Sequence, residues 1–173
     1  SVGCQGTPIY RNSGPEPCPF FEHKALYRSI YEDVPTNNYT IPFGKANLLK
    51  QGAQVSIVSY GAGVHWALEV LSLHSNIQAD LLDLRTLQPL DIESIYASVK
   101  KTGKLIILQE DSLFGGIASD IAASVMENCF ESLDAPVKRV GSLETPIPFN
   151  AELERNYLSK SRFEKELLAL IAH

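Results

Sequence analysis

A glycine-rich stretch of the sequence could bind the phosphates of a dinucleotide. Ser59-Tyr60-Gly61-Ala62-Gly63 follows an apolar run and opens an amphipathic segment, and Asp83 ends the next apolar run. In dinucleotide-binding units such glycines allow a tight turn, and an acidic residue roughly 20 positions further on binds the ribose. Trp66 stands where the third glycine would allow close packing. We therefore favour a tight strand-to-helix turn and keep a dinucleotide-binding module as the alternative.

Paired carboxylates follow another apolar run. Glu110 and Asp111 come directly after residues 104–109. Open α/β sheets bind ligands at the carboxyl ends of their strands, so this pair could be catalytic. It could equally cap the next helix or line an interface, and we favour these roles.

Metal and nucleophile chemistry find little support in the sequence. The chain has four histidines, without a metal-binding spacing: His23, His65, His74 and His173. The sequence also contains no P-loop and no nucleophile elbow. We therefore assign no catalytic, cofactor-binding or metal-binding residue.

Residues 79–91 predict a strand, a turn and a capped helix. The apolar run 79–84 is typical of a strand buried on both faces. Pro89 disfavours a helical conformation at Gln88. Asp91 precedes a segment with helical periodicity and is placed to cap it, typically for about 1 kcal/mol. We therefore give Asp83, Arg85, Pro89 and Asp91 structural roles.

The same rhythm of strand and helix continues along the chain. Strands are predicted at 54–59, 79–84, 104–109 and 136–140, and helices at 64–74, at 92–100, from 115 onward and at 161–171. Such alternation favours an α/β fold with a parallel sheet and helices on both faces.

Composition and charge narrow the choice of partners. The 173 residues suit one domain, and 45% hydrophobic residues can form a sizeable core. A net charge of −5 argues against nucleic acid or an anionic membrane as the main partner. We see no membrane span and no secretory signal. The three cysteines, Cys4, Cys18 and Cys129, form no disulfide framework, so we expect a reducing compartment.

Six blocks of sequence, in order, carry a resemblance to a known family. They are Phe20-Phe21-Glu22-His23-Lys24-Ala25-Leu26-Tyr27, Ile41-Pro42-Phe43-Gly44-Lys45-Ala46, Val58-Ser59-Tyr60-Gly61, Asp83-Leu84-Arg85-Thr86-Leu87-Gln88-Pro89-Leu90-Asp91, Ser98-Val99-Lys100-Lys101-Thr102-Gly103 and Leu133-Asp134-Ala135-Pro136-Val137. Over residues 17–173 the chain closely resembles the C-terminal half of the beta chain of thiamine-diphosphate-dependent 2-oxoacid dehydrogenases, the decarboxylating components of the pyruvate and branched-chain complexes. The resemblance implies the C-terminal domain of the transketolase superfamily, a mostly parallel five-stranded sheet with helices on both faces.

The resemblance also divides the chain. It implies that residues 1–16 are a loop or linker, and that 17–44 hold the last strand of a preceding pyrimidine-binding domain and a connector. Residues 45–173 would form the transketolase-type domain. Transketolase, deoxyxylulose-phosphate synthase and 2-oxoacid:ferredoxin oxidoreductase are alternatives within the superfamily. A plain interaction domain is a further alternative.

The family's cofactor chemistry belongs to parts that we do not find in this sequence. In this family a GDG-containing motif on the alpha chain holds thiamine diphosphate and magnesium, and the catalytic glutamate and histidine lie in the beta chain's N-terminal domain. His23 and His65 inherit neither role. We expect this chain to bind no cofactor and to be inactive in isolation. The resemblance leaves open whether the parent's substrate is pyruvate or a branched-chain 2-oxoacid.

The resemblance implies protein partners for the domain. These are the alpha chain, a second beta chain and the small basic binding domain of the acyltransferase component. Asp134 and the terminal carboxylate of His173 stand at the matching positions for the last contact. The alternative is that Asp134 only turns the chain before Pro136 and that the terminus frays. An anion at the end of a C-terminal helix is unfavourable unless a cation answers it, and a basic partner would supply one. We expect a cytoplasmic location, or the mitochondrial matrix in a eukaryote.

Overall fold

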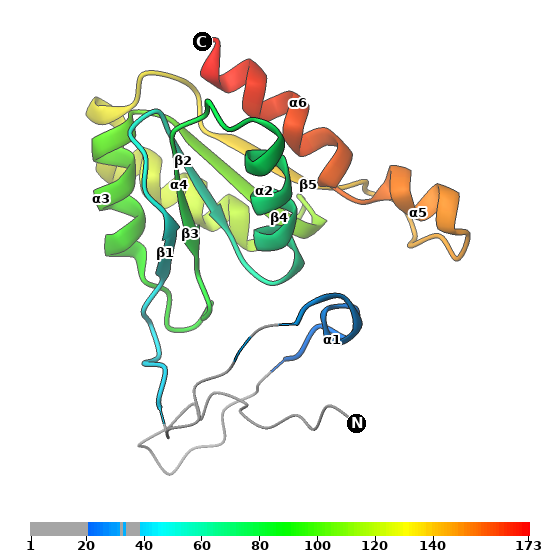
Figure 1. The fold of residues 1–173 in the computed structure, drawn as a ribbon. Coiled ribbons are helices and arrows are strands. Elements are labelled where there is room, and N and C mark those ends of the chain that lie inside the picture. The colour runs from blue at the N-terminus through cyan, green and yellow to red at the C-terminus, as the bar shows by residue number, and fades with distance from the viewer. Residues whose placement is uncertain (1–20, 32, 34–38) are drawn as a thin grey trace.

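The computed structural model describes residues 21–31, 33 and 39–173, and its centre is a sheet flanked by helices (Figure 1). The predicted loop over residues 1–16 lies outside the described residues. Five strands follow the order β1-β3-β2-β4-β5 across the sheet. Their bounds are β1 Asn47–Lys50, β2 Val55–Ser59, β3 Ala79–Asp83, β4 Leu105–Ser112 and β5 Lys138–Ser142.

Four of these strands are the ones that the apolar runs predicted. Strands β2 to β5 pair in parallel, and all residues of β2 are buried, as expected for a strand covered on both faces. The sequence did not predict β1, which pairs antiparallel with β3 and places Asn47 opposite Asp83. The expected mostly parallel, five-stranded sheet is confirmed.

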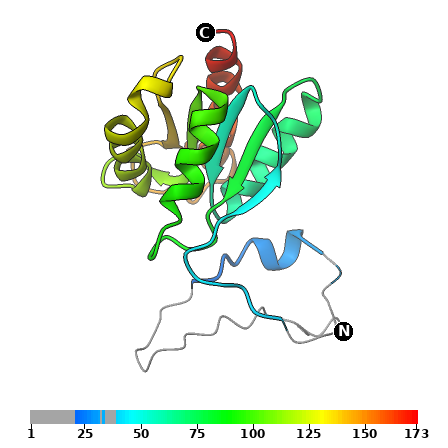
Figure 2. The same ribbon diagram turned by 90° about the vertical axis from the view of Figure 1, so that its left-hand side faces the viewer.

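Two helices cover each face of the sheet (Figure 2). Helices α2 (Ala62–Leu73) and α6 (Lys160–Ile171) pack on one face, and α3 (Ile92–Thr102) and α4 (Ile117–Cys129) pack on the other. The 3-10 helix η1 (Phe130–Ser132) follows α4, and α5 (Ala151–Tyr157) lies between β5 and α6. In the part of the chain that the structure describes, no helix is long and apolar enough to cross a membrane.

Alternation along the strands divides the core in two. Ile57 and Leu81 point into the layer under α2 and α6, whereas Val58 and Leu82 point into the layer under α3 and α4. Burial of one such side chain stabilises the fold by about 1.5–3 kcal/mol. Packing therefore fixes the helices on the sheet. Polar side chains lie at the two ends of the strands, which we call the carboxyl edge and the amino edge.

The N-terminal part of the described chain differs from the prediction. The resemblance implied the last strand of a preceding domain within residues 17–44, and the aromatic run 17–27 is the segment that could form it. The structure shows no strand from residue 21 to residue 25, and Leu26–Ser29 form the short helix α1. The aromatic run has no strand to pair with in the described chain, and a single strand is not stable alone. Residues 21–27 are therefore not the predicted strand, and residues 17–20 lie outside the described residues.

Candidate functional site

A two-residue turn joins β2 to α2 at the carboxyl end of the parallel strands. Gly61 has φ 55°, a left-handed value that favours glycine. At Gly63 an added Cβ would lie 2.3 Å from Ser59 Oγ, whose hydroxyl donates to the Leu108 carbonyl oxygen at 2.8 Å. Trp66 is partly buried against the core. The predicted tight turn is confirmed, and its second glycine lets α2 pack closely on the sheet.

The crossover from β3 to α3 presents Arg85 at the same edge. Arg85 has φ 57°, a conformation that costs a non-glycine residue on the order of 1 kcal/mol. Its N–H donates to Asp83 Oδ1 at 3.1 Å, and its Nε lies 3.9 Å from Asp83 Oδ2. The sequence placed both residues in this turn but gave no sign of the left-handed backbone.

Hydrogen bonds around Thr86 hold the crossover in place. The Thr86 hydroxyl donates to the Pro89 carbonyl oxygen at 2.9 Å and accepts the Gly44 N–H at 2.9 Å. The Gln88–Pro89 peptide bond is cis. The expected non-helical turn before α3 is confirmed, and it is also bonded to the chain that enters the domain.

Asp91 caps α3, as its position predicted. Its Oδ1 accepts the Ser94 N–H at 3.4 Å, and its Oδ2 accepts the Ser94 hydroxyl at 2.7 Å and the Ala46 N–H at 3.0 Å. Burial alone would raise the pKa of Asp91, but these hydrogen bonds and the Lys45 charge outweigh burial and lower the pKa. One carboxylate therefore fixes both the helix start and the entering chain.

The Asp83 carboxyl has the opposite shift. Burial raises its pKa, and the Arg85 N–H, the Arg85 charge and the His65 charge only partly oppose that effect. His65 lies in the first turn of α2, so α2 and the crossover both bring charge to Asp83. Asp83 therefore lies between Arg85 and His65. These three side chains do not form a recognisable catalytic site.

Glu110 links this edge to the N-terminal segment. His23 Nε2 lies 2.8 Å from Glu110 Oε2. Burial raises the pKa of Tyr60, and the charges of Asp111 and Glu110 add to that effect. Glu110 therefore ties the N-terminal segment to the end of β4, while a role of the carboxylate pair in a subunit interface stays a prediction.

The other favoured role, capping of the next helix, falls to Gln109. Its Oε1 accepts the Ala118 N–H at 2.9 Å, while Asp111 Oδ1 accepts the neighbouring Ser112 N–H at 2.7 Å. An added Cβ at Gly116 would lie 2.0 Å from the Gln109 amide nitrogen. The capping prediction for Glu110 and Asp111 is wrong, since a fully buried residue of β4 reaches the helix first.

The structure does not assemble a metal site from the described residues. Within residues 21–31, 33 and 39–173, no three His, Cys, Asp or Glu side chains are placed to share a metal ion. His74 instead pairs with Glu164 of α6 at 2.7 Å. At the carboxyl edge Asp83 pairs with Arg85 and Glu110 pairs with His23.

Asp134 and His173 lie at the opposite, amino edge of the sheet. The loop after η1 and the C-terminus occupy the same upper end of the domain in Figures 1 and 2. Both residues are exposed. The Asp134 N–H donates to the Gly103 carbonyl oxygen at 2.7 Å, and an added Cβ at Gly103 would lie 2.1 Å from Asp134 Oδ2. Because Gly103 has no side chain, the Asp134 loop can pack directly against the end of α3.

Lys104 joins this loop to the C-terminal helix. Its Nζ donates to the Ile171 carbonyl oxygen at 3.0 Å. A cation at this position stabilises the end of a helix. Lys104 therefore stabilises the end of α6 through a backbone carbonyl, a contact between distant segments that no local sequence pattern predicted.

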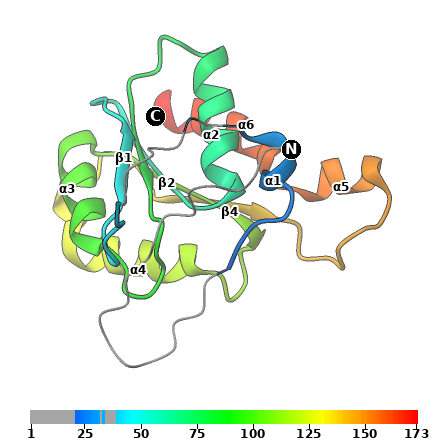
Figure 3. The ribbon, with the colours of Figure 1, turned by 60° about the horizontal axis from the view of Figure 1, so that its bottom comes forward.

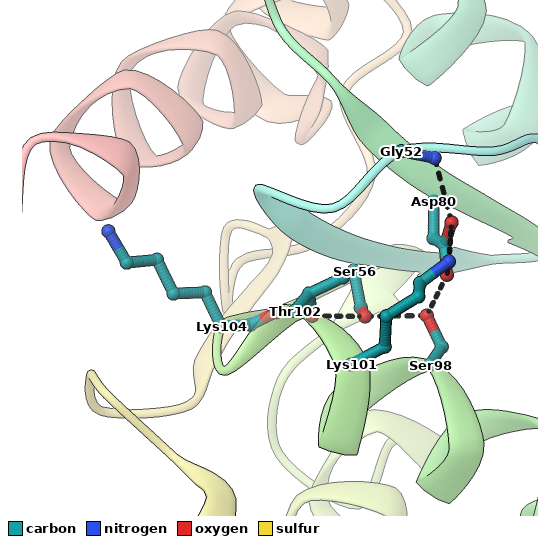
Figure 4. Close-up of polar contacts among 7 residues, drawn as sticks. All are labelled: Gly52, Ser56, Asp80, Ser98, Lys101, Thr102 and Lys104. Atoms are coloured by element: carbon teal, nitrogen blue, oxygen red, sulfur yellow. Dashed lines mark hydrogen bonds and ion pairs between the residues drawn. The ribbon is translucent and has the colours of Figure 1, made fainter.

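A buried polar network lies under the same edge (Figure 4). Asp80, whose side chain is 2% exposed, accepts from Gly52 N–H at 2.9 Å, Ser98 Oγ at 2.7 Å and Lys101 Nζ at 2.6 Å. Ser56 Oγ continues the chain to Ser98 Oγ at 2.6 Å. Since its members satisfy one another, the network fixes α3 and the β1–β2 loop on the sheet.

The comparisons with known proteins agree with this architecture. Residues 44–162, more than half of the chain, match the family described as "Transketolase, C-terminal domain". A solved structure described as "Split gene transketolase, inactive beta4 tetramer" aligns with a TM-score of 0.67 and 26% identity, over 83% of this chain and 46% of that chain.

Curated relatives are beta subunits. "2-oxoisovalerate dehydrogenase subunit beta, mitochondrial" of Dictyostelium discoideum is 42% identical over 136 residues, which are 77% of this chain and 37% of that protein. "Pyruvate dehydrogenase E1 component subunit beta" of Bacillus subtilis is 43% identical over 137 residues, 78% of this chain and 42% of that protein. The chain thus spans less than half of the length of these relatives. It belongs to the transketolase C-terminal domain family and is similar to the beta subunits of 2-oxoacid dehydrogenases.

Proposed function

We propose that this chain is the C-terminal assembly domain of the beta chain of a 2-oxoacid dehydrogenase. The identity of 42% and 43% to two such beta subunits carries the proposal. The parent enzyme would decarboxylate a 2-oxoacid and acylate the lipoyl groups of an acyltransferase component. A domain of transketolase itself is the weaker alternative, because identity to the split-gene transketolase is 26%.

In this proposal thiamine diphosphate and magnesium bind outside the chain. The described residues do not fit them, because no cluster of His, Cys, Asp or Glu could hold the metal there. We therefore assign no catalytic step to residues of this chain.

The domain's own task would be to hold subunits together. Its proposed partners are the alpha chain, a second beta chain and the basic binding domain of the acyltransferase. Asp134 and the carboxylate of His173 would receive the basic domain. Support comes from the amino edge, where Gly103 seats the Asp134 loop and Lys104 anchors the last helix beside it.

For the parent enzyme we propose a class of substrate, the 2-oxoacids, and no single compound. One relative is named for 2-oxoisovalerate and the other for pyruvate, and their identities to this chain are 42% and 43%. The domain does not discriminate between them. A cytoplasmic or mitochondrial-matrix location likewise stays a prediction.

A chimeric enzyme tests the proposal. Residues 44–162 would replace the matching segment of the Bacillus subtilis pyruvate dehydrogenase beta subunit, co-expressed with its alpha subunit. We expect the chimera to co-purify with the alpha subunit and to retain decarboxylation of pyruvate. A control chimera would carry a transketolase C-terminal domain. If both chimeras fail to bind the alpha subunit while each is folded, the assignment to 2-oxoacid dehydrogenases is wrong.

A further inference from the structure

The segment between β5 and α6 forms an arm, residues 143–157, that stands away from the rest of the domain (Figures 1 and 3). All residues of α5 except Tyr157 are exposed. The exposed fractions of Ile147, Phe149 and Leu153 are 69%, 108% and 58%. A seven-residue helix is not stable alone in water, so the arm depends on contacts beyond its own.

The base of the arm is firmly bonded. Arg162 Nη2, from α6, donates to the carbonyl oxygens of Gly141 and Tyr157, both at 2.8 Å. The Leu143 N–H also donates to the Tyr157 carbonyl oxygen at 3.1 Å. Because both ends of the arm are held together, its apolar tip projects from a fixed base. Such a projection is typical of a docking element.

The N-terminal segment attaches beside this base. The Ser142 hydroxyl donates to the Glu110 carbonyl oxygen, and the Glu110 carboxylate pairs with His23 Nε2 at 2.8 Å. Figure 3 shows α1 on the same side of the domain as α5. Phe21 and Tyr31 in this segment are 92% and 79% exposed. The chain therefore enters the domain next to the arm.

We infer that the arm is the docking surface for a domain of the parent chain that precedes residue 1 of this sequence. This inference rests on the proposed function, in which such a domain exists. The chain covers 37% and 42% of its two beta-subunit relatives, which leaves ample chain for a further domain. That domain would be tied covalently to a segment held at the arm's base, and such a tether gives a high effective concentration.

The negative charge of the arm argues against the arm of a second copy as its occupant. The arm carries the carboxylates of Glu144, Glu152 and Glu154 against the one guanidinium of Arg155. A dimer in which the two arms packed against each other would bring these like charges together. The arm instead fits a non-identical surface, an apolar recess rimmed by lysine or arginine.

Hydrogen exchange tests the inference on two proteins, the 173-residue chain and the full-length parent chain. We expect the amides of α5 to exchange at least about ten-fold more slowly in the parent chain, at every protein concentration. Equal exchange in both proteins would overturn the inference. So would slowing that appears in the 173-residue chain as its concentration rises, or slowing that requires the alpha chain, since these results identify another occupant.

A pair of variants checks that the apolar tip makes the contact. In the full-length parent chain, Phe149→Ser should abolish the protection of α5. The control Leu73→Ser removes a side chain that is 70% exposed on α2, away from the arm, and should leave protection intact. Protection that survives Phe149→Ser would overturn the inference. Assembly of the chimeric enzyme is scored separately, so failure of the proposed function is distinguishable from failure of the arm.

Discussion

The ammonium group of Lys104 donates to the carbonyl oxygen of Ile171 at 3.0 Å. Lys104 directly follows Gly103, whose carbonyl oxygen accepts the Asp134 N–H at 2.7 Å. Two adjacent residues thus bond to the two places where the basic partner is proposed to bind. Contacts within the chain therefore hold the amino edge in place without a partner.

Removal of the Lys104 charge should destabilise the last helix. We expect Lys104→Met to lower the free energy of unfolding by about 1 kcal/mol, because the end of α6 loses its cation. Lys165→Met, at an exposed position on the same helix, serves as the control and should change little. Urea midpoints measure both. Equal midpoints for the two variants would show that the contact contributes nothing.

Substitution of Asp91 should reveal its double role. Asp91→Ala removes the cap of α3 and the acceptor for the Ala46 N–H, so we expect a loss of about 2 kcal/mol. Asp91→Asn keeps one acceptor oxygen and should lose roughly half as much, about 1 kcal/mol. If Asn behaves as the wild type in urea unfolding, the second oxygen is dispensable and only the cap matters.

The Lys101–Asp80 ion pair should contribute more to the free energy of unfolding than the adjacent Lys100 does. Lys101→Met leaves the Asp80 carboxylate buried without its cation, and we expect a loss of about 2 kcal/mol, below the range for fully buried pairs because Lys101 is 38% exposed. The control is Lys100→Met, at an exposed position one residue earlier. Thermal unfolding that does not separate the two variants would contradict the prediction.

Asp83 should make stability fall as pH rises. Its pKa is raised in the folded state, so the native protein holds this proton more tightly than the unfolded chain does. Stability is therefore lost between the unfolded carboxyl pKa, about 3.9, and the higher folded pKa. Asp83→Asn keeps the acceptor for the Arg85 N–H and removes that loss. Its stability relative to wild type should rise as pH increases from about 3 to neutrality.

The Asp91 carboxyl supplies an internal comparison for that experiment. Its pKa is lowered, so its contribution is complete above the unfolded pKa and is lost as pH falls through the folded value. Asp91→Asn should therefore lose stability relative to wild type as pH rises over the same interval. Urea unfolding across pH should give slopes of opposite sign for the two variants, and slopes of the same sign would refute one assignment.

Binding of the basic acyltransferase domain should depend on charge at the amino edge. We expect Asp134→Asn, and separately a C-terminally amidated chain, to weaken binding roughly five-fold, about 1 kcal/mol, at low salt. Added salt should shrink these differences because it screens exposed charges. Glu93→Gln changes an exposed carboxylate at the start of α3, towards the carboxyl edge, and is the control. Unchanged affinity in both test proteins would place the docking site elsewhere.

Local sequence signals predicted the central architecture well. Apolar runs located β2 to β5, and Asp91 located the start of α3, because burial and capping act over a few neighbouring residues. Strand β1 escaped prediction because Asn47–Lys50 is a short edge strand without an apolar run. Helix α5 escaped because only Tyr157 is buried, which leaves no apolar stripe.

Polar contacts between distant segments could not be predicted from spacing. Gln109 caps α4 from inside β4, and Lys104 reaches Ile171 across 67 positions. Such pairs depend on how the sheet folds back on itself, which one sequence does not reveal. The resemblance supplied the family and the candidate contacts Asp134 and His173, while the structure supplied the residues that organise them.

The direction of β1 determines where the chain arrives. Because β1 is antiparallel to β3, its first residue Asn47 lies opposite Asp83, the last residue of β3. His23 is held by Glu110 towards the carboxyl end of β4. Both anchor points of the entering polypeptide therefore sit on one side of the sheet, and it need not cross to the other. A parallel first strand would have led the incoming chain past Asp134 and the C-terminus. The antiparallel strand leaves the amino edge accessible to a binding partner.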